Sequence, residues 1–262
     1  MSLSTPPKAL FFDVFGTVVE WRSCVTKALN EAAQRALSDP HKHLPAAVHA
    51  QASAMTVTDW QAFTDEWRAS YSGFTKTFDP SSQGFIPVDQ HHYTALQRLL
   101  EERGIASLFT DEERWDLALC WHRLGPWPDS VRGLELLNRR FRTGTLSNGN
   151  IALLEDLARY GPLPFNDIVS AEHFGVYKPS PTVYRGAAAR LGLEPGECAQ
   201  VAAHLSDLKA AKGQGFQTVY VERRQEEALD VEELARAKEE GYVDMWIDLG
   251  SEELVEIARR FS

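Results

Sequence analysis

The chain has 262 residues, of which 44% are hydrophobic and 24% are charged, so it can bury one large domain or a core with a sizeable insertion. Its net charge of −10 argues against nucleic acid or an anionic membrane as a general partner. There is no signal-peptide pattern and no apolar run of about 18 residues. The three cysteines, Cys24, Cys120 and Cys198, are widely scattered, which favours a reducing compartment. We therefore expect a cytoplasmic protein without nucleic-acid or membrane partners.

The first predicted element is a short buried strand, Ala9-Leu10-Phe11-Phe12, followed at once by Asp13-Val14-Phe15-Gly16-Thr17. A carboxylate at the end of a strand lies at the sheet edge where open α/β sheets bind their ligands. A second Asp two residues after Asp13 would indicate phosphoryl transfer, with one carboxylate attacking and the other moving a proton. That position is Phe15, which can do neither.

Residues 21–130 are predicted to be helical, with no convincing strand. The clearest helix carries five aromatic side chains spaced 3, 4, 4 and 3 residues apart, which gives one apolar stripe. These side chains are Trp60, Phe63, Trp67, Tyr71 and Phe74. Loops are expected at 38–54 and 76–90, and the prolines at 126 and 128 end this helical segment.

Residues 131–262 alternate between predicted helices and strands. The expected strands are 143–146, 200–203, 218–221 and 243–247. The charge-rich run 222–240 is expected to be a solvated helix. Strands that alternate with helices indicate a parallel sheet covered on both faces. The predicted architecture is therefore an α/β core, formed by 1–20 and 131–262, with a helical cap at 21–130.

Polar side chains follow several of these strands. They form four clusters: Asp13 with Thr17, Ser147 with Asn148, Lys178 with Tyr184, and His204 with Asp207. Each cluster alone is a weak signal, since Ser-Asn-Gly is ordinary turn chemistry and Lys-Pro is common on surfaces. The carboxyl ends of parallel strands share one edge of the sheet, so we expect the four clusters to meet there.

In this order and spacing, the clusters resemble the haloacid dehalogenase-like superfamily and, more narrowly, its L-2-haloacid dehalogenases (type II). The resemblance implies a Rossmann-like parallel-sheet core with an inserted helical cap. In family terms, the site would contain Asp13 as nucleophile, Ser147 and Asn148 as second-motif pair, Lys178 as invariant lysine, Tyr184 after it, and Asp207 as fourth-motif acid. The cap pair Trp67-Arg68 resembles a family pair that brings an arginine to the leaving halide.

The chemistry of these residues agrees with the family roles. A lysine within about 4–6 Å of a carboxylate favours its charged form, which makes Lys178 the candidate partner of Asp13. The hydroxyls of Thr17 and Ser147 can hydrogen-bond Asp13 or a substrate carboxylate. Displacement at C2 of a short L-2-haloalkanoic acid would leave an ester on Asp13, which water would hydrolyse. The resemblance implies a 2-hydroxy acid of inverted configuration as the product.

The departing halide needs hydrogen-bond donors, which Arg68 and Asn148 can supply. Asp207, helped by His204, would position or deprotonate the attacking water. The remaining substrate-binding residues are expected to be Tyr184, Phe15 and Trp21. Each assignment has a plainer alternative: Arg68 lies about 100° round the helix from Trp67 and can be a solvated flank. His204 can equally be a structural histidine, and Trp21 a packing residue.

Two substitutions separate the chain from the magnesium-dependent phosphatases of the superfamily. Phe15 replaces the acid that moves the proton, and Ala203 replaces the first metal-ligating Asp of the fourth motif. The chain also differs from the better-studied dehalogenases, which resemble it but carry Ser and Asn where Ala202 and His204 stand here. No cofactor and no metal are expected, and the pairs His41/His43 and His91/His92 are expected on the surface.

Three further functions stay open beside dehalogenation. The same nucleophile could open a strained C–N ring, as in azetidine-2-carboxylate hydrolases, which resemble the same family. A magnesium-dependent phosphatase and a non-catalytic binding protein are weaker alternatives, the latter because a binder has no need of all four clusters. The expected partner is a small 2-haloacid, and only the resemblance implies a homodimer.

Overall fold

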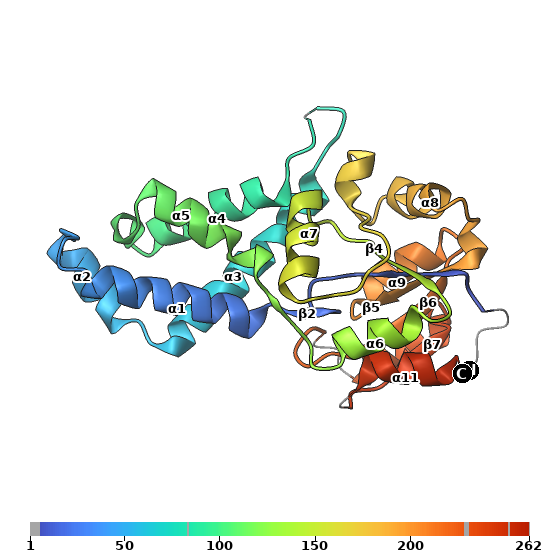
Figure 1. Ribbon diagram of the computed structural model, residues 1–262. Coiled ribbons are helices and arrows are strands. Elements are labelled where there is room, and N and C mark those ends of the chain that lie inside the picture. The colour runs from blue at the N-terminus through green and yellow to red at the C-terminus, as the bar shows by residue number, and fades with distance from the viewer. Residues whose placement is uncertain (1–5, 83, 228–230, 251, 262) are drawn as a thin grey trace. The chain divides into compact units, whose positions relative to one another are not determined.

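The structure is a computed structural model that describes residues 6–82, 84–227, 231–250 and 252–261 (Figure 1). The chain forms two compact units, one from Met1–Glu20 together with Gly125–Ser262 and the other from Trp21–Leu124. We call the first the core unit and the second the cap unit. Among the described residues, no helix is both long and apolar enough to cross a membrane.

The core unit contains a five-stranded sheet in which every neighbouring pair is parallel. Its strands, in spatial order, are β4 (Arg142–Thr145), β1 (Ala9–Phe12), β5 (Cys198–Ala202), β6 (Gln217–Val221) and β7 (Met245–Ile247). All four residues of β1 are fully buried, as a central strand covered on both faces must be. The predicted α/β parallel-sheet fold is confirmed, and the strand order changes direction at β1, the point at which such sheets bind ligands.

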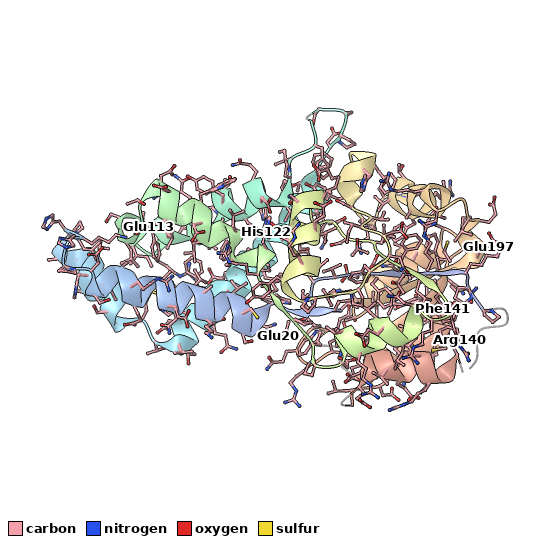
Figure 2. The ribbon with its side chains drawn as sticks, in the orientation of Figure 1. Glu20, Glu113, His122, Arg140, Phe141 and Glu197 are labelled. Atoms are coloured by element: carbon pink, nitrogen blue, oxygen red, sulfur yellow. The ribbon has the colours of Figure 1, made fainter. Side chains whose placement is uncertain are left out.

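Helices connect the strands of the core unit. They are α6 (Ser130–Leu137), α7 (Ile151–Tyr160), α8 (Pro181–Arg190), α9 (Leu205–Lys212), α10 (Val231–Glu240) and α11 (Glu253–Arg260), with 3-10 turns at Ala171–Phe174 and Pro195–Glu197. Helices α6 and α11 pack side by side (Figure 1). Gly133 allows this close approach, because a side chain there would overlap Leu254. Just beyond these helices, the Phe141 ring, labelled in Figure 2, lies 4.8 Å from that of Phe261.

The cap unit is helical, with α1 (Arg22–Ser38), α2 (Ala46–Ala54), α3 (Val57–Thr77), α4 (Val88–Glu102), α5 (Asp111–Ala118) and 3-10 turns at Ala106–Leu108 and Leu119–His122. The predicted aromatic stripe lies on α3, where Trp60, Phe63 and Trp67 are fully buried. A capping box formed by Thr56 and Asp59 begins this helix.

The surface location expected for His92 is wrong. This residue is buried and stacks on Trp121 with ring centroids 4.5 Å apart, and its backbone carbonyl accepts from the Trp67 indole at 2.9 Å. Burial lowers the pKa of His92 well below its usual value, so the ring is a neutral member of the aromatic core. His122, labelled in Figure 2, is also buried and contacts Asp89 at 3.0 Å.

Three further local predictions are wrong. The expected loop 38–54 contains α2, and the segment 21–130 that was expected to lack strands ends in β3 (Gly125–Pro126). In the core unit β3 pairs antiparallel with β2 (Val19–Glu20). The charged run 222–240 is helical only from Val231 onward, whereas residues 222–227 are irregular, and the side chains of Arg223 and Glu226 are buried.

Candidate active site

Asp13 follows β1 directly, and its N–H donates to the Val201 carbonyl of the next strand at 3.0 Å. The residue is only 8% exposed. Lys178 Nζ donates to one carboxylate oxygen at 3.0 Å, while Thr17 Oγ1 and His204 Nδ1 lie 3.1 Å from the other. Burial alone would raise the pKa of Asp13, but the charge of Lys178 and the hydrogen bonds from His204 and Lys178 outweigh it and hold the pKa well below its usual value. Asp13 is therefore a buried and ionised carboxylate.

Lys178 lies between two carboxylates. Its Nζ donates to Asp13 and, at 2.8 Å, to Asp207, and its side chain is 8% exposed. Burial would lower the pKa of Lys178, but the two negative charges overcome this effect and raise it above the usual value. The Asn148 amide fixes the backbone of this lysine, since it accepts from Lys178 N–H at 2.6 Å and donates to Lys178 C=O at 3.2 Å. The second predicted cluster thus positions the third.

Asp207 lies in the first turn of α9, with its carboxylate bound by three donors. Tyr184 Oη donates to one oxygen at 2.6 Å, whereas Lys178 Nζ and Gln200 Nε2 donate to the other at 2.8 and 2.9 Å. Gln200 was not predicted as a site residue. It is fully buried in β5, and its Oε1 has no hydrogen-bond partner among the described residues. The sequence did offer one indication of its role: a polar amide within an otherwise apolar strand needs a buried hydrogen-bond partner.

Thr17 connects the turn after β1 to two other segments. Its hydroxyl donates to Asp13 and accepts from the Ala203 N–H at 2.9 Å, so it lies between the first and fourth motifs. Its carbonyl accepts from Arg223 Nε at 3.0 Å. Arg223 belongs to the run predicted to be solvated, yet it is only 5% exposed and its guanidinium pairs with the buried carboxylates of Asp129 and Glu253 at 2.8 and 2.9 Å. Arg223 is a buried support of the nucleophile turn.

His204 immediately precedes α9, and its ring lies between two carboxylates. Nδ1 faces Asp13 and Nε2 faces Glu226, whose carboxylate oxygen is 3.5 Å away. The Glu226 side chain is 4% exposed and lies against Gly16, where φ is +79° and a Cβ would overlap the carboxylate. Glycine is therefore needed at Gly16 for two reasons, its left-handed backbone and its contact with Glu226. Glu226 was also not predicted, because its neighbours in sequence are charged.

Ser147 and Phe15 frame the turn after β4. The Ser147 hydroxyl accepts from Gly149 N–H at 3.2 Å and is almost fully buried. The half-buried Phe15 ring lies against Gly149, because a Cβ there would be 3.1 Å from the ring. The core unit therefore holds Phe15 and Ser147 on neighbouring turns, after β1 and β4.

Two predicted site residues, Trp21 and Arg68, belong to the cap unit. The Arg68 guanidinium is half-buried and lies over two aromatic rings, 5.6 Å from the Trp21 centroid and 5.0 Å from that of Tyr71. Trp21 also stacks on Trp121 at 6.1 Å. Cation–π contacts hold a guanidinium while leaving its in-plane N–H donors available, so Arg68 is suited to bind an anion.

The donor set around Asp13 differs from that of a metal centre. Its oxygens face an ammonium, a hydroxyl and an imidazole, and the fourth-motif position opposite them is the apolar Ala203. Across the described parts of the chain, no three His, Cys, Asp or Glu side chains are grouped so that they could hold a metal ion. The positive charge beside this nucleophile comes from the protein's own side chains.

Comparison with known proteins places this site in a family. Residues 7–215 match the model of the haloacid dehalogenase-like hydrolases. The (S)-2-haloacid dehalogenase 1 of Pseudomonas sp. (strain CBS-3) is 34% identical over 132 residues, which are 49% of this chain and 57% of that enzyme's length. The (S)-2-haloacid dehalogenase 4A of Burkholderia cepacia is 27% identical over 226 residues, 83% of this chain and 84% of that enzyme.

Solved structures agree with the sequence matches. The crystal structure of a defluorinating L-2-haloacid dehalogenase superposes with a TM-score of 0.80 at 30% identity, covering 97% of this chain and 94% of that one. The family model covers well over half of the sequence and includes every core-unit residue of the predicted site. The resemblance inferred from the four clusters is confirmed: the chain belongs to the haloacid dehalogenase-like hydrolase family.

Proposed function

We propose that this protein hydrolyses short L-2-haloalkanoic acids to 2-hydroxy acids through a covalent ester on Asp13. One observation carries the proposal: the Asp13 carboxylate is buried, yet held ionised by Lys178, Thr17 and His204. A buried carboxylate with little water around it is a stronger nucleophile than a solvated one, provided that a fixed positive charge keeps it deprotonated. The names of the relatives support the same carbon–halide chemistry.

In the first step, an Asp13 oxygen attacks C2 from the side opposite the halogen. The new C–O bond forms as the carbon–halogen bond breaks, and the halide leaves with the electron pair, so the configuration at C2 inverts. Arg68 and the second N–H of the Asn148 amide are the proposed donors to the departing halide. The Ser147 hydroxyl and N–H groups of the turns after β1 and β4 are proposed to bind the substrate carboxylate, while the Thr17 hydroxyl stays on Asp13.

In the second step, water attacks Cγ of the Asp13 ester and releases the 2-hydroxy acid. Asp207 and His204 are the two groups proposed to serve this water. The Asp207 carboxylate already accepts hydrogen bonds from Lys178, Tyr184 and Gln200, which suits it to position Lys178. His204 Nδ1 lies 3.1 Å from the nucleophile itself, which suits it to act on the water.

We propose further that neither step uses a metal ion. Phe15 and Ala203 take the two positions at which the phosphatases that resemble this family carry carboxylates. Lys178 and His204 supply positive charge on the oxygens of Asp13 instead. An ammonium favours an ionised nucleophile without the octahedral oxygen ligands that Mg²⁺ requires.

Halide release tests the activity directly. The protein is incubated with L- and D-2-chloropropionate, fluoroacetate, azetidine-2-carboxylate and p-nitrophenyl phosphate, with and without Mg²⁺. We expect halide from the L-acid and a hydroxy acid of inverted configuration, in both conditions. Magnesium-dependent phosphate release without halide would refute the proposal. Opening of azetidine-2-carboxylate without dehalogenation would show that the enzyme cleaves a C–N bond instead.

A single turnover in H₂¹⁸O tests the covalent step. With enzyme in excess, the label should enter the Asp13 carboxylate, and the first hydroxy acid formed should carry an unlabelled oxygen. Direct attack of water on C2 would instead put the label in the product at once. The Asp13→Asn variant should release no halide. It should still fold, but unfold at a lower urea concentration than wild type, because Lys178 and His204 lose a buried negative partner.

A further inference from the structure

We infer that Glu226 is a positioning residue that holds His204 as the base for hydrolysis of the Asp13 ester. This inference rests on the proposed function and adds to it a residue and the reaction step that the residue serves. Three features of the core unit carry it: the carboxylates on both ring nitrogens of His204, the burial of Glu226, and the saturation of Asp207.

The two ring contacts fix where the imidazole protons are. Nδ1 is 3.1 Å from an Asp13 oxygen and Nε2 is 3.5 Å from a Glu226 oxygen. An ionised carboxylate can only accept hydrogen bonds, so each contact is favourable when the facing nitrogen carries a proton. In the resting enzyme His204 is therefore an imidazolium between Asp13 and Glu226. Charged groups that face it include Asp13 after β1, and Glu226 and Glu227 after β6.

The segment after β6 is built around the start of α9. Glu227 accepts from the Leu205 N–H at 2.9 Å and so caps this helix, which begins next to His204. Glu226, one residue earlier, is buried to 4% side-chain exposure against Gly16. Gly16 belongs to the same turn as Asp13, so the Glu226 carboxylate contacts both the nucleophile turn and the imidazole. Glu226 is therefore held in a fixed position, unlike an exposed acidic side chain on the surface.

Ester formation removes the charge that holds the Nδ1 proton. When Asp13 attacks C2 and the halide leaves, the Asp13 carboxylate becomes a neutral ester, and the Nδ1 proton passes to solvent. The proton on Nε2 stays, because Glu226 still accepts it. His204 is then a neutral imidazole whose Nδ1 lone pair faces the ester. Glu226 thus selects which of the two nitrogens becomes the base.

Hydrolysis restores the resting state. Nδ1 takes a proton from water as the water oxygen bonds to Cγ of Asp13 and the bond from Cγ to the substrate oxygen breaks. The second water proton goes to the released alkoxide, which gives the 2-hydroxy acid. The products are the Asp13 carboxylate, the imidazolium of His204 and the hydroxy acid. One proton and one halide ion are released per turnover, as the overall reaction requires.

Rapid-quench kinetics with L-2-chloropropionate tests this role, because it separates the two steps. The main variant is Glu226→Gln, which keeps the shape and removes the charge. We expect a burst of one halide per active site at the wild-type rate, followed by hydrolysis slowed about 10- to 100-fold, because the imidazole loses the buried carboxylate 3.5 Å from its Nε2. Intact-mass spectrometry should show the ester accumulating on the peptide that contains Asp13. Glu226→Ala, which also removes the acceptor, should show the larger effect.

The pH dependence of ester hydrolysis distinguishes a Glu226 that positions His204 from one that only stabilises the fold. Glu226→Gln removes a negative charge that favours the imidazolium. In a plot of the rate constant of ester hydrolysis against pH, the midpoint should therefore move to lower pH, and the maximal rate constant should fall. Glu222→Gln is the matched control: it is the same substitution on the same segment, but Glu222 accepts from the Leu249 N–H. It should keep the wild-type rates and midpoint.

Each other result counts against the inference. Hydrolysis at the wild-type rate and midpoint in Glu226→Gln would overturn it and leave the proposed function intact. An equal slowing of both steps would show that Glu226 only supports the fold, which also overturns it. Failure of the wild-type protein to release halide from any 2-haloacid would instead refute the proposed function, and the inference with it.

Discussion

Replacing Lys178 by Met removes the cation at the centre of the site and keeps a chain of similar length. Lys178 Nζ is 3.0 Å from an Asp13 oxygen and 2.8 Å from an Asp207 oxygen, and all three side chains are 12% exposed or less. The variant therefore leaves two buried carboxylates with no ammonium between them. Asp207 keeps its hydrogen bonds from Tyr184 and Gln200, whereas Asp13 keeps Thr17 and His204.

The expected cost follows from these distances. Two unit charges 3.0 Å apart interact by about 5 kcal/mol at an effective dielectric constant of 20. Removing one partner of a buried pair typically costs about 3–5 kcal/mol, because the remaining charge stays desolvated. We expect Lys178→Met to lower the free energy of unfolding by that amount at pH 7. The pKa of Asp13 should rise, since burial raises it and the largest opposing charge is gone.

The pH dependence has a definite sign. The pKa of Asp13 is lower in the folded protein than in the unfolded chain, so its contribution is present above about pH 4 and is lost as the pH falls below that value. Lys178 has a raised pKa, so its contribution is complete below about pH 10 and is lost as the pH rises further. The stability difference between wild type and Lys178→Met should therefore shrink in acid.

Urea unfolding at pH 7 and at about pH 3, inside the range in which the Asp13 contribution is lost, measures this difference, and a halide assay measures activity. Lys209→Met is the control, because it breaks only an exposed pair with Glu240 and should leave the unfolding curve close to that of wild type. Halide release by Lys178→Met should fall by about 100-fold or more, because loss of the ammonium raises the pKa of the buried Asp13 carboxyl and leaves less of it ionised. If Lys178→Met unfolds within 1 kcal/mol of wild type with the same m value and still gives a full halide burst, the account of Asp13 given above is wrong.

Three further substitutions test other parts of the molecule. Arg223→Met leaves two buried carboxylates without their cation and should lower the free energy of unfolding by about 3–5 kcal/mol in urea titrations. Gly133→Ala forces α6 away from α11 and should cost about 1–3 kcal/mol, seen as a lower Tm by calorimetry. Arg68→Lys keeps the charge but loses the planar set of donors, so kcat for halide release should fall about 10-fold while the unfolding curve stays within about 0.5 kcal/mol of wild type.

The elements that follow from local pattern were predictable. The strand Ala9–Phe12 was placed to the residue, because a fully buried parallel strand is an apolar run bounded by turn residues. The other four strands of the parallel sheet were placed to within two residues. The α3 stripe followed from helical spacing. The order of the polar clusters was enough to identify the family, although only three of the four follow strands of the sheet. Lys178 and Tyr184 instead lie after the 3-10 turn Ala171–Phe174, before and within α8, so the expectation that a strand precedes them was wrong.

What could not be predicted depends on partners distant in sequence. Composition marked residues 222–227 as solvated, but Arg223 is buried with carboxylates 94 and 30 residues away, and Glu226 is buried against Gly16. The Gln200 amide is similar, since its acceptor Asp207 is brought to it by the turn into α9. A charged run has the same composition whether its side chains meet water or opposite charges in the core. Only the fold distinguishes the two.

The charged side chains of the site keep the same net charge through the proposed reaction. In the inferred resting state, Lys178 and His204 are positive and Asp13, Asp207 and Glu226 are negative, so these five groups carry one net negative charge. Alkylation of Asp13 removes one of the three negative charges, and loss of the Nδ1 proton from His204 removes one of the two positive charges. The cluster therefore has the same net charge before attack and before hydrolysis. A buried site that keeps its net charge through both steps avoids the desolvation penalty of an unbalanced ion.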